Sequence, residues 1–384
     1  MVERTYFDWN ATAPLRREAR AAMSGALGLT GNASSVHAEG RAARQLVEEA
    51  RVRVADLVGA DARNVTFTSG ATEANVMALT AALEVGGRRT LRDRLFVSAI
   101  EHPSVRRGAR FPAGDIKELA VSGDGVVDLA VIARSLEGSE QPLVSIMLAN
   151  NETGVVQPIR QVAEIVHAAS GVLHVDAVQG PGRIDCDIAG LGADLISISS
   201  HKLGGPQGVG AVISRGDIHI ADPLVKGGGQ ERGRRAGTEN VAAIAGFGAA
   251  AAVAKTTDVA RMAFLRDRLE EGIAAITPEA VIFGSASPRL PNTTLFAVPG
   301  VKAETAIIAF DLNGIAVSSG AACSSGKVQA SSVLAAMGVD QALTRGAVRV
   351  SLGWSTTEAE VHRFLETWKL LAGSLLKGRR GIAA

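Results

Sequence analysis

The sequence predicts an α/β protein with a mostly parallel central sheet in a large domain, joined to a smaller α+β domain. Between about residues 64 and 213, short β-branched apolar segments alternate with amphipathic segments, which is typical of βαβ units. The chain has 384 residues, of which 47% are hydrophobic. A chain of this length is too long for one small core, and its hydrophobic content is enough to form a large one, so we expect two closely joined domains.

Apolar segments of strand length define the expected sheet. They are 65–68, 95–100, 143–148, 173–175, 195–199 and 209–213. The segment 160–170 has the periodicity of a helix. The Ala-rich segment 241–254 falls short of the roughly 20 residues needed to cross a bilayer, so we expect a buried helix there.

The large domain is expected to span residues 15–255, and the smaller domain residues 1–14 and 256–384. Strand-like segments near 293–298 and 314–317 and a last helix over 357–377 would belong to the smaller domain. We expect the N-terminal helix, 16–27, to pack with that domain. No internal repeat or Pro- or Ser-rich linker is visible, so the two parts should be in firm contact.

The charge composition narrows the class of partner. Lys plus Arg number 40 and Asp plus Glu 39, a formal net charge of +1 that gives no attraction to nucleic acid or to an anionic membrane. Small-molecule chemistry is therefore favoured. The cysteines, Cys186 and Cys323, are too few and too far apart for a disulfide framework, and residues 1–10 carry charge where an export signal needs apolar residues. We expect a cytoplasmic protein.

Two residues at the ends of apolar segments could hold a cofactor. Lys202, in SSHKLGG, follows segment 195–199, and an amine placed there can bond covalently to an aldehyde. Asp176 ends the segment HVD, where a carboxylate can pair with a protonated pyridine nitrogen. Alone, Lys202 could be an exposed lysine and Asp176 a helix cap. Together they would supply both anchors of a pyridoxal ring.

A phosphate site is expected at the segment TSGATEAN, residues 68–75, where a strand is followed by a Gly turn and a helix. The first N–H groups of a helix and its dipole favour a dianion, and the Thr72 hydroxyl is an added donor. Ordinary helix capping is the alternative. No GxGxxG or Walker lysine is present, which argues against a dinucleotide or ATP.

Further candidates follow other strands. His102, in EHPS, would reach the same sheet edge and could move protons near neutral pH, although a lone histidine is more often structural. Asn151 lies in the polar turn ANNETG and could bond the ring oxygen or the substrate, with simple turn formation as the alternative.

Cys323 lies among small residues in SSGAACSSG, a setting expected to leave the thiol exposed and able to reach a substrate. Cys186 lies in an alternating apolar and acidic stretch, RIDCDI, and receives no role.

At this point the sequence resembles the cysteine desulfurases of the NifS/IscS-like group, in the class V aminotransferase family. The resemblance runs from YFDWNAT and GNASSVH near the N-terminus to VRVSLG near residue 350. It implies fold type I of the pyridoxal-phosphate enzymes. It also implies a homodimer that removes sulfur from L-cysteine, gives L-alanine, and leaves a persulfide on Cys323.

The resemblance also implies a role for each matching residue. Lys202 would hold pyridoxal phosphate, Asp176 would pair with its ring nitrogen, and Gln179 would bond its phenolic oxygen. The phosphate would be bound by Ala71, Thr72, Ser199 and His201, and the phosphate of the partner subunit would be reached by Thr238. His102 would stack on the ring as acid and base, and Arg349 would bind the substrate carboxylate with Asn151 nearby.

An acceptor protein, such as an iron–sulfur scaffold, would collect the sulfur. No intrinsic metal site is expected, although Cys323 could transiently ligate a cluster shared with that scaffold. The alternatives are a selenocysteine lyase or another class V enzyme, and a non-catalytic module that only binds a sulfur-assembly partner. An aminotransferase has no use for the Cys323 segment, and a non-catalytic module would show no yellow cofactor chromophore.

Overall fold

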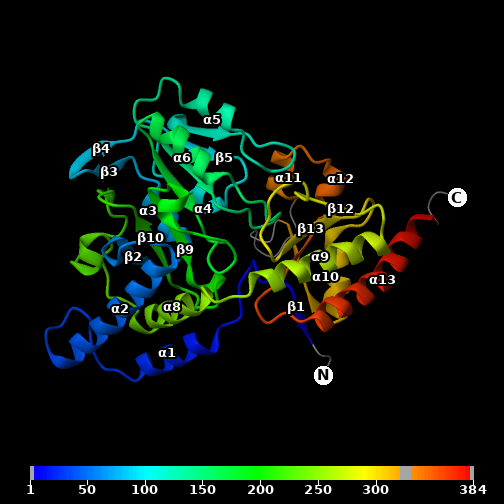
Figure 1. Cartoon of the computed structure of the whole chain (residues 1–384), viewed down its shortest axis with the longest axis horizontal. Coiled ribbons are helices and arrows are strands. Elements are labelled where there is room, and N and C mark those ends of the chain that lie inside the picture. The colour runs from blue at the N-terminus through cyan, green and yellow to red at the C-terminus, as the bar shows by residue number, and fades with distance from the viewer. Residues whose placement is uncertain (1–3, 321–329, 381–384) are drawn as a thin grey trace.

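The computed structural model describes residues 4–320 and 330–380 (Figure 1). Within these residues a seven-stranded sheet has the order β2-β10-β9-β8-β7-β5-β6. Its strands are β2 (Val65–Thr68), β5 (Leu95–Ser98), β6 (Ile116–Leu119), β7 (Leu143–Met147), β8 (Val172–Asp176), β9 (Leu195–Ser199) and β10 (Gly210–Ser214). Only β10 runs against its neighbours among these strands. The expected mostly parallel α/β sheet is confirmed.

The structure adds two polar strands that lie at the edges of sheets. One is β6, with the sequence IKEL, and the other is β4 (Arg88–Leu91), which pairs with β3 (Ala82–Val85) in a three-stranded sheet that also contains β11 (His219–Ile220). Strands at the edge of a sheet need few apolar residues and often carry charge. A search for buried apolar segments therefore overlooks them.

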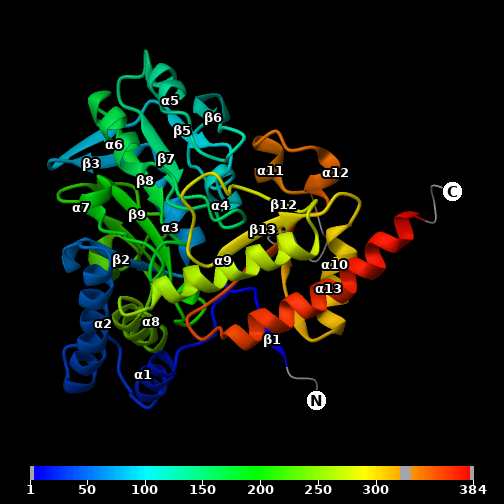
Figure 2. The same cartoon turned by 45° about the vertical axis from the view of Figure 1, so that its right-hand side comes forward.

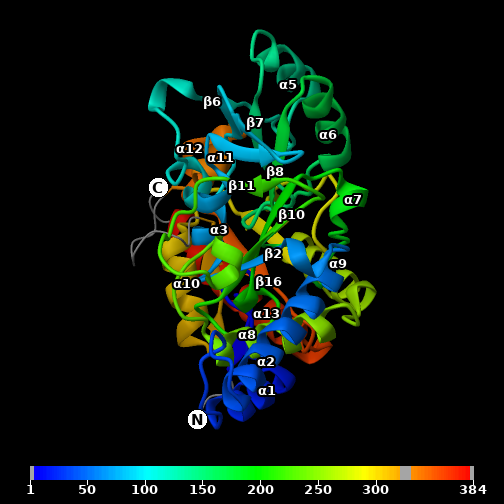
Figure 3. The same cartoon turned by 90° about the vertical axis from the view of Figure 1, so that its left-hand side faces the viewer.

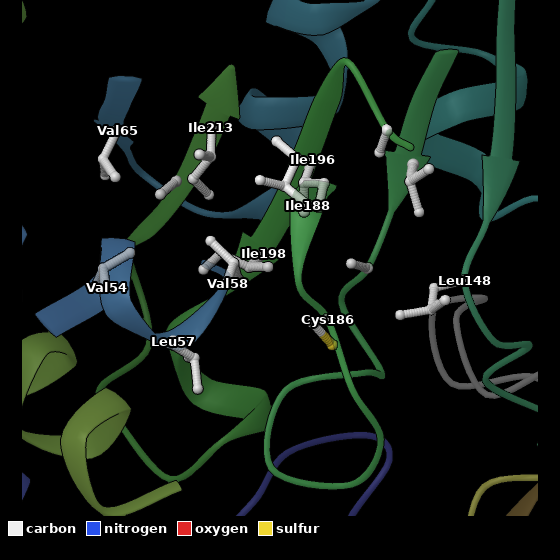
Figure 4. Packing of buried hydrophobic residues seen from close by; sticks show 14 of the residues in the cluster. Val54, Leu57, Val58, Val65, Leu148, Cys186, Ile188, Ile196, Ile198 and Ile213 are labelled. Atoms are coloured by element: carbon white, nitrogen blue, oxygen red, sulfur yellow. The ribbon is translucent and has the colours of Figure 1, made fainter. Parts of the chain in front are cut away.

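The sheet is buried on both faces, as parallel sheets generally are. Alternate side chains point to opposite faces, so Ile196 and Ile198 enter one hydrophobic cluster while Leu195 enters another. The first cluster is covered by α2 (Ala38–Leu57), α5 (Leu129–Leu136), α6 (Ile159–Ala168) and α8 (Val241–Ala254). The second is covered mainly by α3 (Ala71–Ala78). Figure 4 shows Val54 and Val58 packed toward the strands.

The N-terminal helix α1 (Arg17–Leu27) packs along α8, which also contacts α2. Figure 3 shows α1, α2 and α8 grouped below the sheet. The expectation that this helix packs with the smaller domain is wrong. The apolar partner that decides its position is the nearly uniformly buried helix α8, which lies so close that a Cβ added at Gly246 would come within 2.6 Å of Met23 Cγ.

The C-terminal part of the chain has a hydrophobic core of its own. Its four-stranded sheet has the order β12-β13-β16-β15. The elements are β12 (Val281–Ile282), β13 (Thr293–Ala297), β14 (Ile315–Ala316), β15 (Ser318–Ser319), β16 (Val348–Ser351), α9 (Val259–Ile276), α10 (Ala303–Leu312), α11 (Ser332–Ala336), α12 (Gln341–Thr344) and α13 (Glu358–Arg380). Strand β1 (Thr5–Tyr6) pairs with β14, so the N-terminal residues belong here. Figure 2 shows α9 beside α13.

The two parts meet in a shared hydrophobic cluster. Ile100 and Met147 from the large sheet pack with Leu295 and Val333 from the C-terminal part. This contact supports firm joining of the two parts, and boundaries at residues 15 and 256 remain our proposal. Among the described residues, no helix is both long enough and apolar enough to pass through a membrane.

Candidate active site

The candidate residues meet at the carboxyl edge of the central sheet. Asp176 is the last residue of β8, and Lys202 ends a single turn that follows β9. His102 follows β5 and precedes the short helix α4 (Pro103–Arg106), while Asn151 follows β7. Ligands of open α/β sheets bind at this edge, because the connections that leave the strands open a crevice there.

A cavity of about 580 Å³ lies at this edge, within the range of small-molecule sites. The predicted residues that line it are Ala71, Thr72, His102, Asn151, Asp176, Gln179, Ser199, His201, Lys202 and Arg349. The structure thus brings together residues that are far apart in the sequence.

Asp176 is buried and held by neutral donors. Its Oδ2 accepts from the Asn75 amide at 2.8 Å, and its Oδ1 accepts from the backbone N–H of Val178 at 3.0 Å. Lys202 Nζ donates to the backbone carbonyls of Asn10 and Ala11, at 2.5 and 2.9 Å. The carboxylate and the amine line the same cavity from neighbouring strand ends.

His102 is held through one ring nitrogen. The backbone N–H of Ser104 donates to His102 Nδ1 at 3.1 Å, and the Ser104 hydroxyl lies 2.7 Å from the same atom. Burial lowers the pKa of His102; the charge of Asp176 opposes this shift and that of Lys202 adds to it. The imidazole is therefore neutral near pH 7.

The start of α3 faces the cavity at the end predicted for a phosphate. Gly70 precedes the helix with a φ of +154°, a conformation that favours glycine. A Cβ on Gly210 would come within 2.8 Å of the Gly70 backbone, so the two segments are in close contact. The first N–H groups of the helix, at Ala71 and Thr72, have no carbonyl partner within the helix.

His201 lies beside this end, with its Nδ1 3.1 Å from the Thr12 hydroxyl. Burial, together with the nearby charge of Lys202, lowers its pKa to about 4. A neutral imidazole retains one N–H donor, which suits a residue that contacts an anion. Ser199 is buried and also lines the cavity.

Gln179 is oriented by a buried arginine that the sequence analysis did not single out. Arg183 donates to the Gln179 side-chain oxygen, so the Gln179 amide nitrogen is the end left for other partners, and it donates to the Asn10 carbonyl at 3.1 Å. Burial lowers the pKa of Arg183 to about 10. At neutral pH it remains charged and fixes which end of the amide is turned away from it.

Arg349 is 1% exposed and lies at the junction of the two parts. Its Nη2 donates to Asp8 Oδ1 at 2.8 Å, and its Nη1 donates to the Asn151 carbonyl at 3.0 Å. Its Nε has no hydrogen-bond partner within the described part of the chain. Asp8, also missed by the sequence analysis, thus holds the guanidinium predicted to bind a substrate carboxylate.

Thr238 and Cys186 do not line this cavity, and a third residue of the sequence analysis is not described. Thr238 is exposed and does not line it, as expected of a residue predicted to reach a partner subunit, and that role stays a prediction. Cys323 lies outside the described residues. Cys186 is buried in the core below the sheet (Figure 4), where burial, more than the neighbouring Asp185, raises the pKa of its thiol. This agrees with assigning it no role.

The sequence analysis also missed two buried acids near the cavity. Glu101 accepts from the Met147 backbone N–H at 2.7 Å, and burial raises its pKa to about 8. Glu152 accepts from the Ser331 hydroxyl at 2.5 Å, and burial raises its pKa to about 7. Glu101 directly follows an apolar segment and Glu152 lies in the polar turn ANNETG, and neither position distinguishes a buried carboxyl group from an exposed one.

Comparison with known proteins gives a consistent result. The family model described as aminotransferase class-V matches residues 5–364. The chain is 41% identical to a cysteine desulfurase of Cereibacter sphaeroides, covering 95% of each chain, and 37% identical to an IscS-like cysteine desulfurase of Mycobacterium tuberculosis, covering 99% of this chain and 98% of the relative.

The solved structure of a NifS-like protein from Rickettsia africae has a TM-score of 0.87 and 35% identity to this chain. The similarity covers 97% of this chain and 100% of that one. The predicted resemblance and the predicted fold class are both confirmed, and the chain belongs to the class V aminotransferase family.

Proposed function

We propose that this chain is a cytoplasmic, homodimeric cysteine desulfurase that uses pyridoxal phosphate to convert L-cysteine into L-alanine and a persulfide on Cys323. The observation that carries the proposal is that Lys202, Asp176 and His102 line one cavity. The family match and the relatives named cysteine desulfurase support it.

The residues present fit pyridoxal phosphate. The cavity has an amine that can hold an aldehyde, Lys202, and a buried carboxylate that can face a ring nitrogen, Asp176. At another part of its wall, the start of α3 offers N–H groups with no partner within the helix, beside Thr72, and this is the donor set that a phosphate needs. When bound, the cofactor would withdraw electrons from the amino acid attached to it.

The chain's own residues would then divide the work. Lys202 Nζ would take the α-proton of the substrate, and His102 Nε2 would hold the proton of the neutral imidazole near the reacting atoms. Arg349 would bind the substrate carboxylate, a task suited to a guanidinium. Cys323 Sγ would accept the sulfur, so that cysteine and the thiol give alanine and a persulfide with no further oxidant or reductant.

A persulfide on Cys323 would pass to an acceptor protein, and an iron–sulfur scaffold is the acceptor we propose. Among the described residues no group of three metal-ligating side chains gathers at one place, so any cluster contact by Cys323 would need ligands from that scaffold.

The test compares K202A, C323A and C186A variants for bound chromophore and for alanine formed from cysteine. We expect K202A to lose the covalently held yellow chromophore and C323A to keep it, and both to lose at least about 10²-fold in alanine formation. C186A is the matched control and should keep both properties. Alanine formation by C323A at the wild-type rate would overturn the persulfide proposal.

A further inference from the structure

Asn75 is a buried polar residue in a helix that is otherwise apolar on its inner face. It is 1% exposed, and the neighbouring Ala74, Met77 and Ala78 on α3 pack into a hydrophobic cluster. Asparagine is an unfavourable residue inside a helix, and burying its amide costs free energy unless the amide is hydrogen-bonded. Its presence there calls for partners that use the amide.

The amide nitrogen of Asn75 joins two parts of the candidate site. It donates to Asp176 Oδ2 at 2.8 Å and to the Ser104 hydroxyl at 2.9 Å. An amide nitrogen carries two hydrogens, so these two bonds use both of them. The Asn75 oxygen accepts no hydrogen bond from any residue that the structure describes, so the two N–H groups account for its polar contacts there.

The bond to the Ser104 hydroxyl reinforces a direction of hydrogen bonding at His102 that the backbone already sets. Because the backbone N–H of Ser104 donates to His102 Nδ1, that nitrogen is an acceptor and carries no proton. The Ser104 hydroxyl, 2.7 Å away, must then donate to Nδ1 as well. It can do so while accepting from Asn75, which leaves the proton of the neutral imidazole on Nε2.

We propose that Asn75 is a positioning residue that holds the Asp176 carboxylate directly and the His102 imidazole through Ser104, keeping the His102 proton on Nε2. We call these four residues the Asn75 network. The inference rests on the proposed function for its catalytic meaning, because it makes His102 Nε2 the atom that presents a proton. The hydrogen-bond pattern itself does not depend on that function.

The test is a pH titration of the His102 ring nitrogens by ¹⁵N NMR in the full-length protein as purified. The chain has seven histidines, and a H102Q variant identifies the resonances of this one. In the wild-type protein we expect the tautomer with the proton on Nε2 and a titration midpoint below that of an exposed histidine, as burial dictates.

In N75L both amide donors are lost. The Ser104 hydroxyl is then free to turn and accept a hydrogen from a charged imidazole, and Asp176 loses a donor that partly neutralises it. Both changes favour the charged form, so the His102 midpoint should rise by about 1 pH unit. M77A is the control: it removes a buried side chain of the same helix and should lower the melting temperature without moving this midpoint.

A double-mutant cycle with S104A tests the route of the coupling. The part of the N75L shift that passes through the Ser104 hydroxyl should disappear in the S104A background, so the shift should be smaller there, whereas the part that passes through Asp176 should remain. A shift of the same size in both backgrounds, or no shift in N75L, would overturn the inference. Should N75L fail to fold, N75A gives the same readout with a residue that favours helices.

The outcomes also separate this inference from the proposed function. If the wild-type protein forms alanine from cysteine but the titration midpoint of His102 is the same in N75L as in the wild type, the positioning role is wrong and the proposed function is unaffected. If the midpoint moves as expected but no alanine forms, the network is present and the proposed function is wrong.

Discussion

The cavity has two sides that are built differently. The Asn75 network joins Asn75, Asp176, Ser104 and His102 through neutral donors, and all four residues lie in the large domain. On the other side, Asn151 and Arg349 line the cavity; together with Asp8, Glu152 and Ser331 behind them, they form what we call the junction network. It joins segments of both parts of the chain and contains buried charged or titratable groups.

The difference teaches how the site depends on the fold. Folding of the central sheet alone would place the members of the Asn75 network, because α3, β8 and α4 belong to or flank that sheet. The junction network exists only when the C-terminal part packs against the sheet. Changes on the first side should therefore affect cofactor chemistry, whereas changes on the second should affect substrate binding and the pH dependence of stability.

The largest expected effect is on the first side. D176N keeps the shape of the side chain but removes the charge that faces the cavity, and we expect a loss of at least about 10²-fold in kcat for alanine formation. The absorption spectrum of the bound cofactor should change as well. Asp194 offers a matched control, because it is a buried aspartate at the opposite edge of the same sheet, bonded to His167 and Arg215. D194N should lower stability and leave the spectrum unchanged; an unchanged spectrum in D176N would contradict the assigned role.

A smaller effect is expected at the junction. R349K keeps the positive charge beside Asp8 but loses the planar pair of donors, so the KM for cysteine should rise about 10–100-fold with a lesser change in kcat. Steady-state alanine formation measures both constants. R289K, at the half-buried Arg289–Glu270 pair outside the cavity, is the control and should leave KM as it is. An R349K enzyme with the wild-type KM would remove Arg349 from substrate binding.

The smallest effect concerns stability and pH. Burial raises the pKa of Glu152 from 4.5 to about 7, so the folded state binds a proton that the unfolded state releases between these values. The stabilisation of the folded state by this bound proton is fully present below pH 4.5 and is lost as the pH rises to about 7. E152Q cannot ionise, so at pH 8 its free energy of unfolding should exceed that of the wild type by about 1–3 kcal/mol.

Denaturant unfolding at pH 5 and pH 8 measures this difference. E164Q, at an exposed i,i+4 pair with Arg160, is the control and should follow the wild type at both pH values. If wild type and E152Q lose stability in parallel between pH 5 and 8, the Glu152 carboxyl group is not held protonated by the junction.

Much of the site could be predicted from the sequence because the end of a buried strand can be recognised where an apolar segment gives way to polar residues. Lys202 lies three residues after one apolar segment and Asp176 ends another, and the carboxyl ends of parallel strands share one edge of a sheet. Asn75 could not be found this way. It lies within a helix, and which face of that helix meets the sheet depends on contacts with residues about 30 and 100 positions away.

By itself, the sequence determined the alternation of strands and helices, the residues at strand ends and the family resemblance, because each of these depends on residue types at short spacing. Only the tertiary structure decided that Arg349 is held by Asp8, that Asn75 joins Asp176 to His102, and that α1 packs along α8. The physical reason is that burial and the choice of hydrogen-bond partners are set by side chains distant in the sequence. Local periodicity does not indicate which of these side chains come into contact.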